Sequence, residues 1–143
     1  ATPLRDLLAA WQPRSPAPRE RRAVITAVAD AVARLHVRGV DHDDLSTKNF
    51  LVRHGPPVEC FVIDLEAVRS LDRTLPRERI LRALMQLDDC PRGVSRCDRM
   101  RFLAAYERAT HSRFTRSDLA EVRRMLRDRF ARSGRDFARE GPR

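Results

Sequence analysis

Two aspartates and one asparagine carry the clearest chemical signal in this sequence. Asp44 and Asn49 stand five residues apart in a polar, aperiodic stretch, and Asp64 follows two short apolar runs further along the chain. Phosphoryl transfer needs this combination, with one carboxylate facing the acceptor hydroxyl while an amide oxygen and a second carboxylate hold Mg²⁺ on the nucleotide phosphates. An isolated loop aspartate is more often a turn or cap residue. It is the spacing of the three residues that predicts phosphoryl-transfer chemistry.

Particular elements must bring these side chains together. Residues 19–38 are the clearest predicted helix, because Val24, Val28, Val32 and Leu35 recur at helical spacing and Gly39 is a natural C-cap. Two β-branched or aromatic runs, 50–52 and 60–63, flank a Gly-Pro turn and predict a hairpin. Asp44 and Asn49 would then lie in a loop after the long helix, and Asp64 at the far end of the hairpin.

The rest of the chain is predicted to be helical. Thr2 is the expected N-cap of a helix that runs to Trp11. Further helices are expected over 76–87, 95–110 and 115–131, the last two opened by capping boxes at Ser95 with Asp98 and Thr115 with Asp118. The predicted fold class is therefore α+β and mainly α, with one small β-hairpin.

The motif H-x-D-L-x-x-x-N, from His42 to Asn49, followed by a hairpin and Ile63-Asp64, resembles the catalytic loop and metal-binding segment of the protein-kinase-like fold. Within that superfamily, LHVRGVDHDDLSTKNFLV and FVIDLEAVR are similar to the lipopolysaccharide core kinases, which phosphorylate Kdo or heptose sugars. ERILRALMQLDD and RMRFLAAYER are similar to that family's C-terminal helices. The resemblance covers roughly residues 20–110.

This resemblance implies a role for each matching residue. Asp44 would be the catalytic base that orients the acceptor hydroxyl, and Asn49 and Asp64 would be the Mg²⁺ ligands, with ATP as co-substrate. His42 would brace the catalytic loop rather than titrate. Lys48, the chain's only lysine, has two interpretations of equal weight: a compact phosphate-binding charge, or chance placement on a solvated loop.

Three positions depart from the protein-kinase pattern, and one of them is Ser46, which stands where protein kinases have a loop lysine two residues after the catalytic aspartate. Asp43 stands where many protein kinases have an arginine before the catalytic aspartate, so regulation by activation-loop phosphorylation is not expected. Asp64 is followed by Leu65-Glu66 rather than Phe-Gly, which sugar and antibiotic kinases of this fold tolerate.

The resemblance also implies a domain organisation. Residues 1–143 would be the C-terminal lobe, with the catalytic loop over 42–49 and the metal-binding segment over 63–66. A Gly-rich phosphate loop, a strand lysine and its glutamate partner are not found upstream of residue 20, and the first glycine is Gly39. We therefore expect the N-terminal ATP lobe to be absent from this chain and to be a partner it needs. The chain alone should transfer phosphate slowly or not at all.

The chain is strongly basic. The net charge is +9, and 28 of the 29 basic residues are arginine. A GC-rich genome explains this more simply than selection for phosphate or lipid contacts. Residues 96–143 hold 14 arginines against 7 acidic residues, a surplus that suits an anionic membrane surface or an acidic sugar, although a solvated helix surface explains it at least as well.

The sequence also bounds the compartment. No apolar run is long enough to span a bilayer, and three cysteines at no metal-ligand spacing indicate reduced thiols. We expect a cytoplasmic protein, peripheral at the inner face of the inner membrane.

Several functions remain open at this point. The favoured acceptor is a sugar or lipid-linked sugar of the lipopolysaccharide inner core. A protein Ser/Thr kinase or an antibiotic kinase-like phosphotransferase would use the same active-site residues. A non-catalytic, degenerate kinase module is a third alternative, although such a module has no chemical reason to keep all three site residues. Nucleic-acid binding is disfavoured, because Trp11 and Tyr106 are isolated and form no stacking platform.

Overall fold

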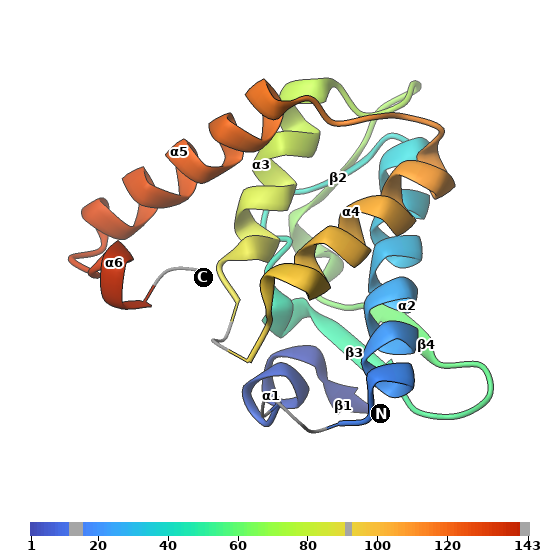
Figure 1. The fold of residues 1–143 in the computed structure, drawn as a ribbon. Helices are drawn as coiled ribbons and strands as arrows, with labels where there is room; N and C mark the ends of the chain where they lie inside the picture. The colour runs from blue at the N-terminus through green and yellow to red at the C-terminus, as the bar shows by residue number, and fades with distance from the viewer. Residues whose placement is uncertain (12–15, 91–92, 141–143) are drawn as a thin grey trace.

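The computed structural model describes residues 1–11, 16–90 and 93–140, which form a mainly helical body with two small sheets (Figure 1). The helices are α1 (Leu4–Ala9), α2 (Pro18–Val37), α3 (Arg77–Asp88), α4 (Arg96–Thr110), α5 (Arg116–Arg132) and α6 (Phe137–Glu140). The strands are β1 (Thr2–Pro3), β2 (Val40–His42), β3 (Phe50–Arg53), β4 (Glu59–Val62) and β5 (Val68–Ser70), with 3₁₀ turns at Thr47–Asn49 and Leu65–Ala67. In the described residues no helix is both long and apolar enough to cross a bilayer.

Helix α2 is the central element of the body and packs most extensively against α4. Val24, Val28 and Val32 of its predicted stripe are almost completely buried. The helix ends at Val37 with Arg38 as its C-cap, and Gly39, the predicted cap, is the next residue. Its φ of +69° favours glycine. A Cβ there would also lie 2.1 Å from the carbonyl oxygen of Arg73. The backbone angle and the close approach of another segment therefore both require glycine at this position.

A buried ion pair joins α2 to the beginning of α4. Arg21 of α2 contacts the carboxylate of Asp98, whose side chain is fully buried. Asp98 also closes the predicted capping box, since its carboxylate accepts from the Ser95 backbone N–H at 3.0 Å and the Ser95 Oγ accepts from the Asp98 backbone N–H. Burial raises the pKa of Asp98, but the hydrogen bonds from Arg21 and Ser95 outweigh it and lower the pKa to about 2.

The predicted hairpin is β3–β4, with Leu51 opposite Phe61 and Arg53 opposite Glu59. The prediction for the N-terminus was wrong in part. Thr2 caps no helix but pairs with Val52 as an edge strand beside β3, and α1 begins at Leu4. Pro3 suits this position, because an edge strand can spare the N–H that proline lacks.

A second sheet was not predicted. Residues 40–42, expected to be loop, form β2 and pair antiparallel with β5, so that Val40 lies opposite Ser70 and His42 opposite Val68. This pairing joins segments on either side of the hairpin. The sequence of β2 shows no alternation of apolar and polar residues that would predict a strand, because the strand is stabilised by a partner remote in the sequence. It fixes the start of the polar loop against the segment that follows Asp64.

His36, in the last turn of α2, is buried and hydrogen-bonded. Its Nδ1 lies 2.8 Å from the hydroxyl of Tyr106 on α4. Burial lowers the pKa of His36 to about 4, because desolvation disfavours the charged imidazolium. The imidazole is therefore neutral in the folded protein at neutral pH.

We predict that this histidine makes the free energy of unfolding pH-dependent. The folded-state pKa lies below the unfolded value, so the unfolded chain binds the extra proton and stability is lost as pH falls through 6.5 toward 4. Urea titrations at about pH 7 and about pH 5 should differ by about 2 kcal/mol from this group alone. His36→Gln keeps a partner for Tyr106 and removes the titration, so it should lose this part of the difference. An equal pH difference in both proteins would contradict the assignment.

Candidate active site

The polar loop that carries Asp44 and Asn49 begins at β2 and ends at β3. Much of it is buried: His42, Leu45, Thr47 and Asn49 each expose 5% or less of their surface. Buried polar groups need hydrogen-bond partners, because an unmade bond costs about 1–3 kcal/mol. The loop therefore holds one conformation only if its neighbours supply those partners.

His42 contacts both sides of the site. Its Nδ1 accepts a hydrogen bond from the backbone N–H of Asp44 at 3.2 Å, and its Nε2 lies 3.4 Å from the carbonyl oxygen of Ile63. An accepting Nδ1 requires the proton on Nε2, which can then donate to Ile63. The imidazole thus links the Asp44 backbone to the strand end that precedes Asp64.

Asp44 exposes its carboxylate at the surface of the loop. The side chain is 38% exposed, and its Oδ2 lies 2.7 Å from the Nζ of Lys48, four residues further along the loop. Partial burial raises the pKa of Asp44, but hydrogen bonds and positive charge from Lys48, with smaller contributions from neighbouring loop residues, lower it below the ordinary aspartate range. Asp44 is therefore ionised at neutral pH and able to accept a proton or a hydrogen bond.

Asn49 closes the loop on itself. Its Nδ2 donates to the carbonyl oxygen of Asp44 at 2.7 Å. Because the amide nitrogen is used in this way, the amide oxygen is the atom that can act as a metal ligand. The backbone carbonyl of Asn49 also accepts from the N–H of Ile63 at 2.9 Å, which holds the two segments together.

Asp64 directly follows this last contact and has a left-handed backbone, with φ 61° and ψ 64°. A non-glycine residue in this region is uncommon and costs free energy that the surrounding structure must offset. The side chain is exposed. The structure thus brings Asp44 and Asn49 into direct contact and places Asp64 one residue from the backbone bond between Ile63 and Asn49.

The donor chemistry of this site fits Mg²⁺. The amide oxygen of Asn49 and the carboxylate of Asp64 are hard oxygen donors, which Mg²⁺ prefers, and Mg²⁺ takes its remaining ligands from water and phosphate. In the described part of the chain no cluster of three or more His, Cys, Asp or Glu side chains could hold a metal ion by itself. A cation held by Asn49 and Asp64 would need further ligands, which water or phosphate oxygens can supply.

The contacts that α3 and β5 make to the loop were not predicted from the sequence. Gln86 of α3 hydrogen-bonds to the backbone of Asp43 and Leu45. The carboxylate of Asp43 also lies 3.2 Å from an Nη of Arg69, in β5 after the predicted metal-binding segment. The sequence did contain a signal for Gln86, because it is the one polar residue in the otherwise apolar run 83–87 of the predicted helix. The structure shows that it is buried.

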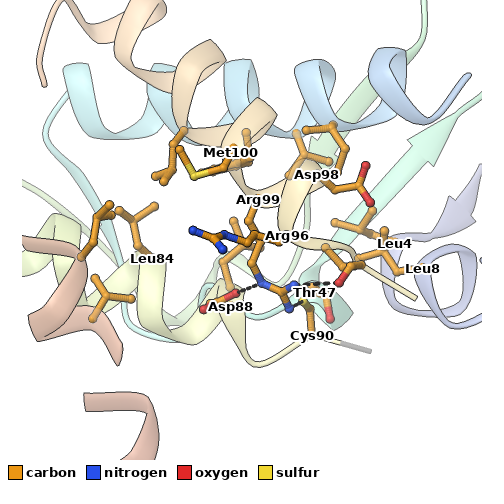
Figure 2. Close-up of a pocket in the computed structure, with 18 of the residues that line it drawn as sticks. Leu4, Leu8, Thr47, Leu84, Asp88, Cys90, Arg96, Asp98, Arg99 and Met100 are labelled. Atoms are coloured by element: carbon orange, nitrogen blue, oxygen red, sulfur yellow. Dashed lines mark hydrogen bonds and ion pairs between the residues drawn. The ribbon is translucent and has the colours of Figure 1, made fainter. Parts of the chain in front are cut away.

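An apolar cavity of about 540 Å³ lies beside the loop and is lined by residues from each of the helices α1 to α5 (Figure 2). Its lining is mostly aliphatic and includes Leu8, Val28 and Leu84. Thr47, inside the loop, also lines it, so cavity and candidate active site share one wall. The charged groups of the lining have both signs: Arg96 and Arg99 are positive, Asp88 and Asp98 are negative, and Arg99 pairs with Asp88 at 2.6 Å.

Comparison with known proteins agrees with this geometry. The family model described as the lipopolysaccharide kinase (Kdo/WaaP) family matches residues 1–106. The lipopolysaccharide core heptose(I) kinase WaaP of Pseudomonas aeruginosa is 36% identical over 104 residues, which are 68% of this chain and 39% of that protein. A solved structure of WaaP in complex with acyl carrier protein is similar with a TM-score of 0.75 and 28% identity, covering 89% of this chain and 56% of that one.

The chain thus spans well under two thirds of either relative. The matched region nevertheless includes α1, the polar loop that carries Asp44 and Asn49, the hairpin and most of α4. Because the family model covers more than half of the sequence, this chain belongs to the lipopolysaccharide kinase (Kdo/WaaP) family.

Proposed function

We propose that this protein transfers the γ-phosphate of ATP to a sugar hydroxyl, on Kdo or heptose, of the lipopolysaccharide inner core. The observation that carries the proposal is the hydrogen-bonded arrangement of Asp44 and Asn49 beside Asp64, in a chain that belongs to a lipopolysaccharide kinase family. The family supports the class of acceptor, and the site residues support the chemistry. The nucleotide would be covered by an N-terminal lobe outside residues 1–143.

The chemistry follows from the positions of these groups. The ionised carboxylate of Asp44 accepts a hydrogen bond from the acceptor hydroxyl. This hydrogen bond directs the hydroxyl oxygen toward the γ-phosphorus. As the new O–P bond forms and the bond to the ADP oxygen breaks, the hydroxyl proton passes to Asp44. Asn49 and Asp64 would hold Mg²⁺, which when bound neutralises negative charge on the phosphates.

Lys48 is proposed to contact the phosphates. In the structure its ammonium pairs with Asp44, and its side chain is 55% exposed, so it is free to move toward an incoming anion. An ammonium acts on phosphate as a compact point charge, whereas the larger guanidinium of arginine has a fixed planar fork. The single lysine in an arginine-rich chain fits a requirement for the smaller group.

The proposal includes a location at the cytoplasmic face of the inner membrane. The acceptor is lipid-linked, and the region from α4 onward carries 14 arginines against 7 acidic residues. Positive charge near anionic lipid contributes about 1 kcal/mol for each basic residue close to the surface. This charge supports peripheral attachment beside the acceptor.

Binding to an acyl carrier protein is also proposed. The related WaaP structure contains an acyl carrier protein. In the present chain, the cavity of about 540 Å³ has the size of a small-molecule site and an aliphatic lining that suits an acyl chain. Its position against Thr47 would couple an occupant to the catalytic loop.

The first prediction concerns the base. Asp44→Asn keeps the shape of the side chain but cannot accept the proton, so kcat should fall by about 10²–10⁴ while KM for ATP changes little. The assay is transfer of radiolabelled γ-phosphate by the intact protein to dephosphorylated inner-core oligosaccharide that carries Kdo and heptose. Asp72→Asn, at an exposed aspartate outside residues 42–49, is the matched control. Wild-type turnover in the Asp44→Asn protein would show that Asp44 is not the base, whereas no transfer by the wild type itself would favour a non-catalytic module.

The second prediction concerns Lys48. Loss of one charge-assisted hydrogen bond costs about 1.5–3 kcal/mol, so Lys48→Met should lower kcat/KM for ATP by roughly ten- to hundredfold. Lys48→Arg keeps the charge but changes its shape, and we expect it to recover only part of the loss. Unchanged turnover in Lys48→Arg would show that no compact charge is required at this position.

The third prediction concerns the cavity. Met100 lines it and is 52% exposed, so Met100→Asp adds a negative charge at its mouth without disturbing the core. The affinity for an acyl carrier protein that bears a long acyl chain, measured by calorimetry, should fall by tenfold or more. Val37→Asp, at 48% exposure and outside this cavity, is the matched control. Equal affinity for acylated and unacylated carrier protein would refute a role for the cavity.

A further inference from the structure

Gln86 of α3 makes two hydrogen bonds to the backbone on either side of Asp44. Its Nε2 donates to the carbonyl oxygen of Asp43 at 2.5 Å, and its Oε1 accepts from the backbone N–H of Leu45 at 2.9 Å. The residue is only 8% exposed. Gln86 is separated from these partners by more than forty positions in the sequence, so the contact is a product of the tertiary fold.

An amide side chain is well suited to this task. It carries a donor and an acceptor in one rigid plane, so a single residue can satisfy one carbonyl and one N–H at the same time. The two peptide groups it holds enclose the Cα of Asp44. Fixing both of them fixes the backbone angles of Asp44, and therefore the direction in which its side chain leaves the loop.

The partners of the Asp44 carboxylate are side chains of its own loop: Lys48 and, with smaller effect, Ser46 and Asn49. The carboxylate is 38% exposed, and its ion-pair partner, Lys48, is a flexible and more exposed side chain. An exposed ion pair contributes at most about 1 kcal/mol and does not hold one geometry. The orientation of this carboxylate thus depends on the backbone beneath it.

A second residue on the same face of α3 reaches the same segment. Arg79 stands seven residues before Gln86, which is two helical turns. Its Nη1 lies 3.1 Å from the carboxylate of Asp41 and 3.8 Å from that of Asp43. Helix α3 therefore contacts this segment at two places. Arg79 pairs with carboxylates near the start of the loop, and Gln86 binds the backbone on either side of Asp44.

We propose that Gln86 is a positioning residue for phosphoryl transfer, which holds the Asp43 and Leu45 peptide groups so that the Asp44 carboxylate faces the acceptor hydroxyl. This inference rests on the proposed function, since it assigns Gln86 a role at the same site. Gln86 does not touch the reacting atoms. Its effect is transmitted through the loop backbone alone.

The kinetic test uses Gln86→Met in the intact protein, with ATP and the dephosphorylated inner-core oligosaccharide as substrates. Methionine keeps the volume and removes both hydrogen bonds. Misplacement of a catalytic group by about 1 Å can cost 10²-fold, so kcat should fall ten- to hundredfold while KM for ATP stays within about threefold. Met85→Ala, at a buried position of the same helix, controls for loss of stability. An equal loss of kcat in both variants would overturn the inference.

Hydrogen–deuterium exchange tests the hydrogen bonds without relying on activity. In the wild type, the Leu45 amide should exchange far more slowly than an exposed amide, because it donates to a buried oxygen. Gln86→Glu keeps an acceptor for Leu45 but no donor for Asp43 when ionised, so it should retain part of this protection while Gln86→Met loses it. Fast exchange at Leu45 in the wild type would overturn the inference even if no variant folds.

The two proposals fail in different ways. If the wild type transfers no phosphate to the oligosaccharide, the proposed function is wrong, and the positioning role is wrong with it. If the wild type is active and Gln86→Met exposes the Leu45 amide yet keeps its kcat, the positioning role alone is wrong. A selective loss of kcat together with faster exchange at Leu45 supports both.

Discussion

The burial of a polar loop is the constraint on which the rest of this structure depends. A loop that carries carboxylates and amides can enter a protein interior only if its backbone and side-chain polar groups find partners there. Here the partners come from three directions: the imidazole of His42, the amide of Asn49 within the loop, and Gln86 on α3. The result is a segment that is rigid at its base and exposed at the Asp44 carboxylate.

The helical body supplies the frame for this loop. The predicted α2 and α4 pack together and are joined at one end by Arg21 and Asp98, and at the other by His36 and Tyr106. Breaking a buried ion pair costs about 3–5 kcal/mol, so this end of the helix pair is held firmly. The cavity beside the loop shares Thr47 with it, so an occupant of the cavity would contact the polar loop.

Sequence reasoning succeeded where structure is decided locally. The capping boxes at Ser95 and Thr115, the glycine that follows α2 and the β3–β4 hairpin all depend on residues a few positions apart. It failed for β1 and for the β2–β5 sheet. Those strands are too short to show a periodic pattern, and their partners are remote in sequence. The family resemblance from the loop motif is confirmed by the family model.

The sequence by itself determined the residue types available for chemistry and, through the spacing of Asp44, Asn49 and Asp64, the class of reaction they suit. Only the tertiary structure decided how these groups are held. The Ile63–Asn49 hydrogen bond continues the hairpin pairing up to the loop, and Gln86 reaches across from a separate helix. The sequence did not reveal which backbone groups Gln86 would bind, because they lie more than forty positions away and come within hydrogen-bonding distance only in the folded chain.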